Sequence, residues 1–232
     1  MSDQEGRRPK LSRQRVIEAA LELADRDGIE ALTIRALADR LGTRPMSIYH
    51  YVDGKDAVLD GLVEHVFAEM EAPAADLDWR EAIRRRCHSA RAVLVRHPWS
   101  VPLLESRRSP GPELLRHHEA MLAALARGGL PLPLMAHAYA VLDSFVYGFA
   151  IEEASLPAQG GEGMAEVAQE IAAAFQSGEY PHLVRLTSEH VMRPGYSFGA
   201  SFEVGLEMLL AGFAAAASSP EWANPPEVAV PG

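Results

Sequence analysis

The sequence has one cysteine, Cys87, so no internal disulfide can form, and a reducing cytoplasm is the expected compartment. It has no uninterrupted run of about 18 apolar residues, so we expect neither a membrane span nor a membrane partner. The first ten residues, MSDQEGRRPK, are polar and precede no apolar stretch, which is not the pattern of a secretory signal. Hydrophobic residues make up 48% of the chain, enough to bury a core, and we expect a cytoplasmic globular protein.

Positive charge is scarce, and it is unevenly distributed. The formal net charge is −10, yet residues 1–55 carry a net charge of +1 and residues 56–232 carry −11. The cations of a basic N-terminal arm are Arg7, Arg8, Lys10, Arg13 and Arg15. This asymmetry favours a head that approaches an anion such as nucleic acid and a body that does not, while a charged tail that is merely solvated is the alternative.

Helical periodicity dominates the chain, and no strand alternation of any length occurs, which predicts an all-α fold. Proline, glycine and capping residues set the expected limits of the helices. The expected helices cover residues 12–27, 34–41, 45–51, 56–70, 79–96, 113–127, 134–155, 165–176, 181–191 and 198–217, and a shorter apolar piece surrounds 101–104.

The segment GTRPMSIYHY (42–51) predicts a helix-turn-helix, because the turn GTR joins two short helices. Ile48 is expected to pack against Leu37 and Leu41, which leaves the rest of the third helix outside. The outward residues are Arg44, Pro45, Met46, Ser47, Tyr49, His50 and Tyr51. A helix that presents these side chains fits the DNA major groove, where arginine binds guanine and apolar groups meet thymine methyls. Burial of the tyrosines under the fourth helix and local hydrogen bonding of His50 are the alternatives.

At these residues the sequence resembles the TetR family of bacterial transcription regulators. The resemblance rests on VIEAALELADRDGIEALTIRALADRLGTRPMSIYHYVDGKDAVLDGLVE (16–64). More loosely, FEVGLEMLLAGF (202–213), HPW (97–99) and YAVLDSFVYGFAIEE (139–153) are similar to the C-terminal domain of tetracycline-repressor type. The resemblance implies a transcription regulator, a repressor that a small-molecule effector releases from its operator, and not an enzyme.

The resemblance also implies roles for single residues. Thr33 and Arg35 would contact phosphate and base at the second helix, and Arg44, Pro45, Met46 and Ser47 would face base edges. Tyr49, Tyr51 and Lys55 would hold phosphates, which fix register without reading sequence. His50 completes the expected DNA-binding set. The partner is then double-stranded DNA with a palindromic operator, bound by a homodimer.

The larger C-terminal part is expected to hold both the dimer interface and the effector. The near-continuous apolar faces of 134–151 and 198–217 exceed what one small core needs, so we predict a four-helix interface between two subunits, with two central core helices as the alternative. The candidate effector-binding residues are His88, Arg91, Leu104, His117, Met121, Phe145 and Phe149. Tetracycline-binding members use a magnesium-holding histidine after the fifth helix, and SVPLLESRRS (100–109) has none, so no metal or cofactor is expected.

The expected domain organisation follows from these assignments. We predict a flexible basic arm (1–10), a helix-turn-helix domain (11–55), a connecting helix (56–70), a ligand-binding and dimerisation domain (71–217) and a disordered tail (218–232).

Other functions remain open at this stage. GYSFG (195–199) matches the nucleophile elbow of hydrolases, but no strand pattern precedes it and no histidine follows Ser197. A DNA-binding protein without any ligand is a second alternative, and activation instead of repression is a third. The identity of the effector and the operator sequence cannot be inferred from these residues.

Overall fold

The computed structural model describes residues 10–106, 110–156 and 180–223, and every element in these ranges is a helix. The chain divides into two units, Met1–Met70 with Arg96–His118, and Glu71–Val95 with Glu119–Gly232. Residues 96–118, which we had expected in the second domain, therefore group with the first unit. The basic arm to residue 9 and the expected helix 165–176 lie outside the described residues.

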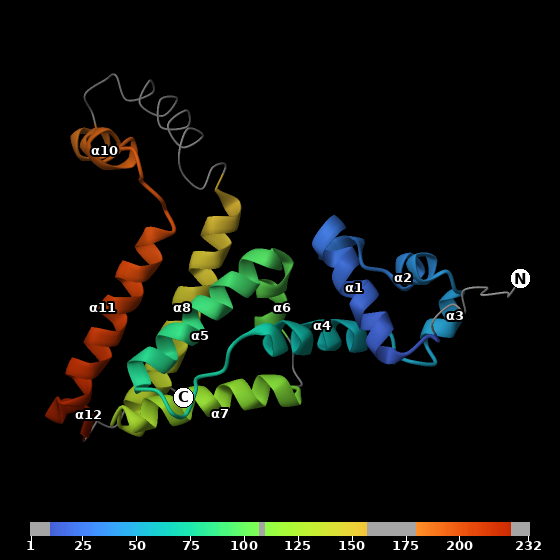
Figure 1. The fold of residues 1–232 in the computed structure, drawn as a ribbon, viewed down its shortest axis with the longest axis horizontal. Coiled ribbons are helices and arrows are strands. Elements are labelled where there is room, and N and C mark those ends of the chain that lie inside the picture. Colours follow the sequence, from blue (N-terminus) through green and yellow to red (C-terminus); the bar gives the residue numbers. More distant parts are fainter. Residues whose placement is uncertain (1–9, 107–109, 157–179, 224–232) are drawn as a thin grey trace, which may run out of the picture. The chain divides into compact units, whose positions relative to one another are not determined.

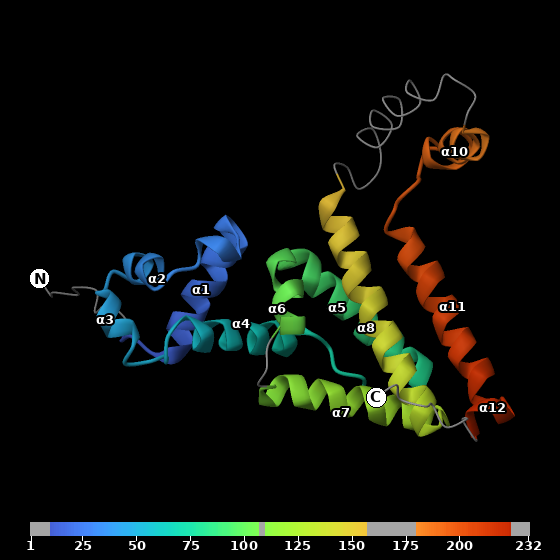
Figure 2. The ribbon, with the colours of Figure 1, turned by 180° about the vertical axis from the view of Figure 1, so that it is seen from behind.

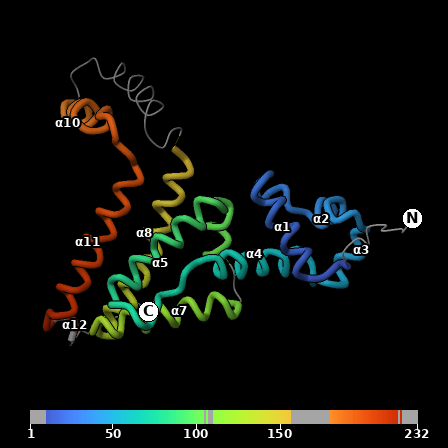
Figure 3. The backbone as a smooth tube through the Cα atoms, in the orientation of Figure 1, coloured from blue at the N-terminus to red at the C-terminus, as the bar shows by residue number. Residues whose placement is uncertain are grey.

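The first unit begins with four helices that the sequence specifies locally. They are α1 (Arg13–Asp27), α2 (Ile34–Leu41), α3 (Pro45–Ile48) and α4 (Lys55–Glu69), with a 3-10 turn η1 (Ile29–Ala31) after α1. Ser12 caps α1 as predicted, because its hydroxyl accepts the N–H of Arg15. Both α2 and α4 pack against α1 (Figure 3). The core between them is apolar and includes Val16, Ala20, Leu37, Val58 and Leu62.

A later stretch of chain returns to this unit. It holds the 3-10 turn η2 (Pro98–Ser100), α6 (Val101–Ser106) and the beginning of α7 (Pro112–Arg127). Glu64 of α4 accepts the backbone N–H of Glu113 at 2.9 Å, and so satisfies a free donor at the start of α7. Phe67 of α4 lies against the ring of His117 with 5.6 Å between centroids.

The second unit contains α5 (Trp79–Arg96), the rest of α7, α8 (Leu132–Ser155), α10 (Pro181–Leu186), the π-helical turn η3 (Thr187–Val191), α11 (Ala200–Ala217) and α12 (Pro220–Ala223). In Figures 1 and 2, α8 and α11 lie side by side, and they are in contact. Stacked rings join them, with 5.1 Å between the centroids of Phe145 and Phe202.

Some helix limits differ from the expectation. The third helix ends at Ile48 and not near Tyr51, because the N–H groups of Tyr51 and Val52 both bond to the carbonyl of Ile48 and turn the chain. Residues 220–223 of the expected disordered tail form the helical turn α12. The predicted helix 181–191 is split into α10 and a π-helical turn.

By length and composition alone, α8 and α11 would each be able to cross a membrane. Much of their apolar surface is not covered by the described residues, since Val141 is 41% exposed, Val204 56% and Met208 69%. Helices of this kind are equally typical of an interface between subunits.

Candidate nucleic-acid interface

The two ends of α2 are fixed by the sequence. Thr33 is the N-cap, and its hydroxyl accepts the N–H of Ala36 at 3.1 Å. Gly42 follows the helix in the left-handed conformation, with φ of 62°, which glycine adopts without strain. The N–H of Thr43 then bonds to the carbonyl of Ala38 at 2.9 Å. The turn therefore leads into α3 in one defined direction.

The short helix α3 has one inward residue. Ile48 is fully buried, as predicted, and α3 packs against α2. Pro45 occupies the first turn, where its missing N–H is no loss. Met46 is 73% exposed and Tyr49 is 48% exposed. Exposed apolar and aromatic side chains next to a cation form a surface that suits a duplex groove.

The structure places the other predicted DNA-binding residues around this helix. Thr33, Arg35, Arg44, Pro45, His50 and Lys55 are exposed, and Ser47 and Tyr51 are half-buried. The sequence left two possibilities open for Tyr51, an outward position at the DNA surface or burial under the fourth helix. Its half-burial lies between them. The fully inward residue of this turn is Val52, which we had not singled out.

The cations of this surface are available for another molecule. Within the described ranges, Arg35, Arg44 and Lys55 have no ion pair. Arg40, by contrast, donates its Nε–H to Glu22 of α1 at 2.9 Å. Gly54, with φ of 91°, starts α4 and sets Lys55 in its first turn. Exposed cations without an internal partner can each neutralise a phosphate.

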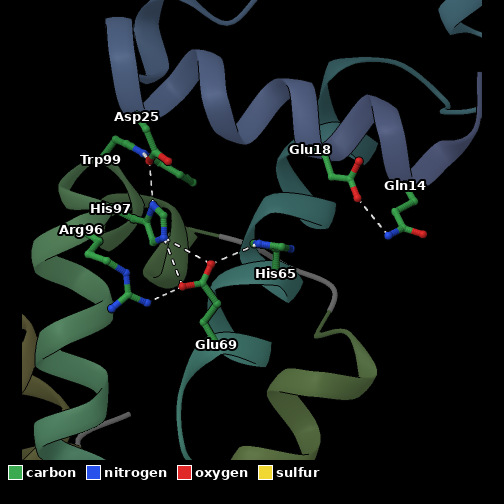
Figure 4. A network of polar contacts seen from close by, with 8 residues as sticks. All are labelled: Gln14, Glu18, Asp25, His65, Glu69, Arg96, His97 and Trp99. Atoms are coloured by element: carbon green, nitrogen blue, oxygen red, sulfur yellow. Dashed lines mark hydrogen bonds and ion pairs between the residues drawn. The ribbon is translucent and has the colours of Figure 1, made fainter. Parts of the chain in front are cut away.

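A polar network in the same unit joins α1 to η2 (Figure 4). His97, which is only 5% exposed, contacts Asp25 at the end of α1, with 2.7 Å between Nδ1 and Oδ1. Trp99 donates its indole N–H to the same oxygen at 2.7 Å. Because these residues come from distant parts of the chain, the HPW triplet fastens the returning segment to the helix-turn-helix.

Glu69 extends the network to α4. Its carboxylate lies 3.4 Å from Nε2 of His97, accepts a bond from Arg96 and lies 3.1 Å from Nε2 of His65 (Figure 4). Partial burial alone would raise the pKa of Glu69, but the hydrogen bond from Arg96 and the charge of His97 outweigh it and hold the pKa below its ordinary value. His97 therefore stands between carboxylates of α1 and α4.

The candidate effector-binding residues divide between the two units. Leu104 and His117 belong to the first, and His88, Arg91, Met121, Phe145 and Phe149 belong to the second. His117 and Met121 are buried, whereas Leu104 is half-buried. Within the described ranges, no group of three or more histidine, cysteine or acidic side chains is arranged to hold a metal ion.

Several of these candidates contact one another or α11. Nε and Nη2 of Arg91 donate to the two carboxylate oxygens of Glu153 at 2.8 and 2.6 Å, and its Nη1 donates to the carbonyl of Gly199 at 3.3 Å. The same guanidinium lies over the rings of Phe149 and Phe202. His88 pairs with Glu203 at 2.7 Å. Arg91 is thus satisfied within the unit.

The sequence analysis missed one residue of the second unit, Arg86. It is 1% exposed, and its Nη2 lies 2.7 Å from Oδ1 of Asp143. The signal was present, because position 86 shares the inward spacing of Ile83, Ala90 and Val93 on α5. The run RRR (84–86) concealed it, since Arg84 and Arg85 are ordinary paired cations nearer the surface.

Comparisons with known proteins agree with this geometry. A family model described as "Bacterial regulatory proteins, tetR family" matches residues 16–62, and one described as "Tetracyclin repressor-like, C-terminal domain" matches residues 72–217. An HTH-type transcriptional regulator of Saccharopolyspora erythraea is 34% identical over 90% of this chain and 87% of its own length. The HTH-type transcriptional repressor DrrR1 of Streptomyces coeruleorubidus is 37% identical over 62% of this chain and 54% of its own length.

A solved structure is similar over nearly the whole chain. The crystal structure of the Streptomyces coelicolor protein ActR in complex with actinorhodin has a TM-score of 0.77 and 29% sequence identity. The match covers 91% of this chain and 99% of that one. The similarity therefore extends over both units and not only the helix-turn-helix.

Proposed function

The chain belongs to the tetR family of bacterial regulatory proteins, and from that premise we propose which of its residues read DNA and join two subunits. As a member of the family it is a DNA-binding transcription regulator, a repressor that a small molecule releases, and not an enzyme. The observation that carries the assignment of the reading surface is α3, with Ile48 buried and Met46 and Tyr49 exposed.

We assign base reading to the N-terminal end of α3. Arg44 precedes the helix and is exposed without an ion pair in the described ranges, so its guanidinium is free to bind guanine. Met46 offers an apolar tip to thymine methyls, and Pro45 and Ser47 lie beside it. Arg35, in the first turn of α2, reaches toward the same groove.

Phosphate contacts hold the reading helix in register. Tyr49, His50 and Tyr51 follow α3, and Lys55 stands in the first turn of α4. The N-terminus of α2 adds backbone N–H groups near Thr33, which suit an anion. These contacts carry affinity and not sequence preference.

A second copy of the chain covers the apolar faces of α8 and α11. A groove of about 680 Å³ lies between these helices and is lined almost wholly by apolar groups from Val141, Phe145, Met208 and Leu209. A four-helix arrangement of two α8 and two α11 helices would bury this surface. The dimer would then present two α3 helices to the two halves of a palindromic operator.

The effector binds in the body of a cytoplasmic protein and shifts the spacing of the two heads. ActR, a similar protein, was crystallised with actinorhodin. Release of DNA requires that the ligand favour the non-binding spacing, typically by about 1–3 kcal/mol of coupling.

A gel-shift experiment with DNA from upstream of the protein's own gene tests the proposal. The dimer should bind a palindromic fragment more tightly than random DNA at moderate salt. Equal binding of both fragments would refute a specific regulator. Tyr49→Ala should weaken binding to every sequence alike, because a phosphate contact carries no base preference.

A further inference from the structure

His97 is a buried histidine whose two ring nitrogens both face carboxylates (Figure 4). Nδ1 lies 2.7 Å from Oδ1 of Asp25 on α1, and Nε2 lies 3.4 Å from both carboxylate oxygens of Glu69 on α4. A neutral imidazole has one N–H, and only the charged imidazolium can donate from both nitrogens. The geometry therefore suits the charged ring, because a neutral ring would turn one bare nitrogen toward a carboxylate oxygen.

The charged groups around the ring come from three helices. Asp25 lies in the last turn of α1, Glu69 and its more exposed neighbour His65 lie on α4, and Arg96 ends α5 and bonds to Glu69. Burial raises the pKa of Glu69, but the hydrogen bond from Arg96 and the charge of His97 outweigh it, so Glu69 stays ionised where a histidine titrates. Two carboxylates then surround one guanidinium and the ring. A proton on the ring balances their charge, and its loss leaves an excess negative charge in a poorly solvated place.

The contacts of this cluster fix the helix that supports the reading surface. α1 packs against α2, and α2 packs against α3. The turn η2, which follows His97, contacts both α1 and α4, and it leads into α6, which contacts α4. Trp99 of this turn also donates to the oxygen of Asp25 that faces Nδ1. Loosening the contact at His97 therefore frees α1, and with it α3, from the returning segment.

We propose that the proton is a second regulatory ligand of this protein: protonated His97 fastens α1 to η2 and α4, and this raises the affinity of the dimer for a palindromic operator. The inference rests on the proposed function, because it requires a dimer that binds two half-sites. Two heads that are held firmly match the spacing of the half-sites, whereas loosely held heads lose conformational freedom on binding. A single half-site sets no spacing, so its binding should change little with pH.

The sign of the effect follows from linkage. The proton binds more strongly to the fastened arrangement than to the loosened one, so a lower pH favours the fastened one. Histidine is the side chain whose charge ordinarily changes between about pH 5 and pH 8. Affinity for the palindrome should therefore be higher near pH 6 than near pH 8. By reciprocity, binding of the palindrome should take up protons near pH 7.

Fluorescence anisotropy with the full chain tests the proposal. Affinities for a palindrome from upstream of the protein's own gene and for one of its half-sites are measured near pH 6 and near pH 8 at fixed ionic strength. Sedimentation checks that the protein is dimeric at both pH values. We expect the ratio of palindrome affinity to half-site affinity to fall about fivefold or more as the pH rises.

The decisive variant is His97→Asn. Its amide can donate to Asp25 from near the position of Nδ1, but it cannot take up a proton, so the ratio should no longer depend on pH. Asp25→Asn is the second variant, because it keeps an oxygen that accepts from Nδ1 and from Trp99 but removes a charge that stabilises the imidazolium. It should move the fall in the ratio to lower pH, and it tests the proposal even where His97→Asn does not fold.

The controls are two other histidines of the first unit. His65 also lies beside Glu69, at 3.1 Å, and His65→Gln should retain the pH dependence of the ratio. His50 belongs to the proposed DNA surface, so His50→Gln should lower both affinities and still retain that pH dependence. Loss of the pH dependence in His50→Gln would place the proton at the DNA surface and overturn the inference.

The inference is also overturned if the wild-type ratio is constant or rises with pH, or if a folded His97→Asn variant responds to pH as the wild type does. An Asp25→Asn variant with an unshifted pH response counts against it equally. If the wild type binds the palindrome no better than random DNA at either pH, the proposed function is refuted. If the palindrome is bound specifically but His97 does not set its pH dependence, only the inference about the proton is refuted.

Discussion

His97 donates its Nδ1–H to Asp25 at 2.7 Å, and the same carboxylate oxygen also accepts the indole N–H of Trp99 at 2.7 Å. Two largely buried donors from the returning segment thus depend on one acceptor at the end of α1 (Figure 4). The contact links the helix-turn-helix to the chain that leads into α6.

We predict that Asp25→Ala lowers the free energy of unfolding of the first unit by about 1–3 kcal/mol, because it leaves both donors without their acceptor. Urea unfolding followed by circular dichroism measures the change. Asp27→Ala is the matched control, since Asp27 lies on the same helix and pairs only with the exposed Arg26 in the described structure. An equal loss in both variants would argue against a special role for Asp25.

The second prediction concerns pH and Glu69. Its pKa is held below the ordinary value of 4.5, because Arg96 and His97 together outweigh the effect of burial. A carboxylate with a lowered folded-state pKa stabilises the protein above its unfolded-state pKa, and this contribution is lost as the pH falls through the folded-state value. The difference in unfolding free energy between wild type and Glu69→Gln should therefore be largest near pH 6 and shrink below pH 4.5. A difference that stays constant with pH would contradict this account.

Local signals made much of the first unit predictable. Ser12, Thr33 and Gly42 fix helix ends through bonds to residues three or four positions away, and such bonds can be read from short stretches of sequence. The end of α3 was predicted less well, because only the fold shows that Ile48 accepts two bonds and stops the helix.

In both units, the residues whose decisive contacts are long-range were less predictable. His97 was quoted only as part of a triplet, since Asp25 and Glu69 reach it from distant positions. Arg86 resembled its neighbours in a basic run, and only the position of Asp143 on another helix reveals that it is buried and paired.

The third prediction uses Cys87 as a reporter. Burial raises the pKa of its thiol to about 11, well above the ordinary 9.0, so almost no thiolate is present at pH 8. Labelling by a thiol reagent should be slow in the folded protein and fast in urea. Because the folded-state pKa is raised, the unfolded thiol ionises first, and stability should decline as the pH rises from about 9 toward 11. Rapid labelling of the native protein would show that the region around Cys87 is open.

The fourth prediction separates base reading from phosphate binding. Arg44→Ala should cost about 1–3 kcal/mol at one base position and relax the preference there, if the arginine binds guanine with two hydrogen bonds. Lys55→Ala should weaken binding to all sequences and reduce the salt dependence by about one phosphate contact.

Arg40→Ala is the control, because Arg40 already pairs with Glu22. Binding to a set of operator variants at several salt concentrations distinguishes the three outcomes, and unchanged preference in the Arg44 variant would remove it from the base-reading residues.

The fifth prediction concerns the face shared by α8 and α11. Met208 is 69% exposed and lines the apolar groove between these helices, so Met208→Asp should place a charge in the dimer interface. A buried charge without a partner is strongly unfavourable, and the variant should sediment as a monomer at concentrations where the wild type is dimeric. Leu186→Asp on α10 changes an apolar residue of similar exposure, 53%, outside this groove, and should leave the dimer intact.

Since two half-sites must be bound together, the Met208 variant should also lose the gain in affinity that a palindrome gives over a single half-site. A dimer that survives Met208→Asp would mean that another surface joins the subunits.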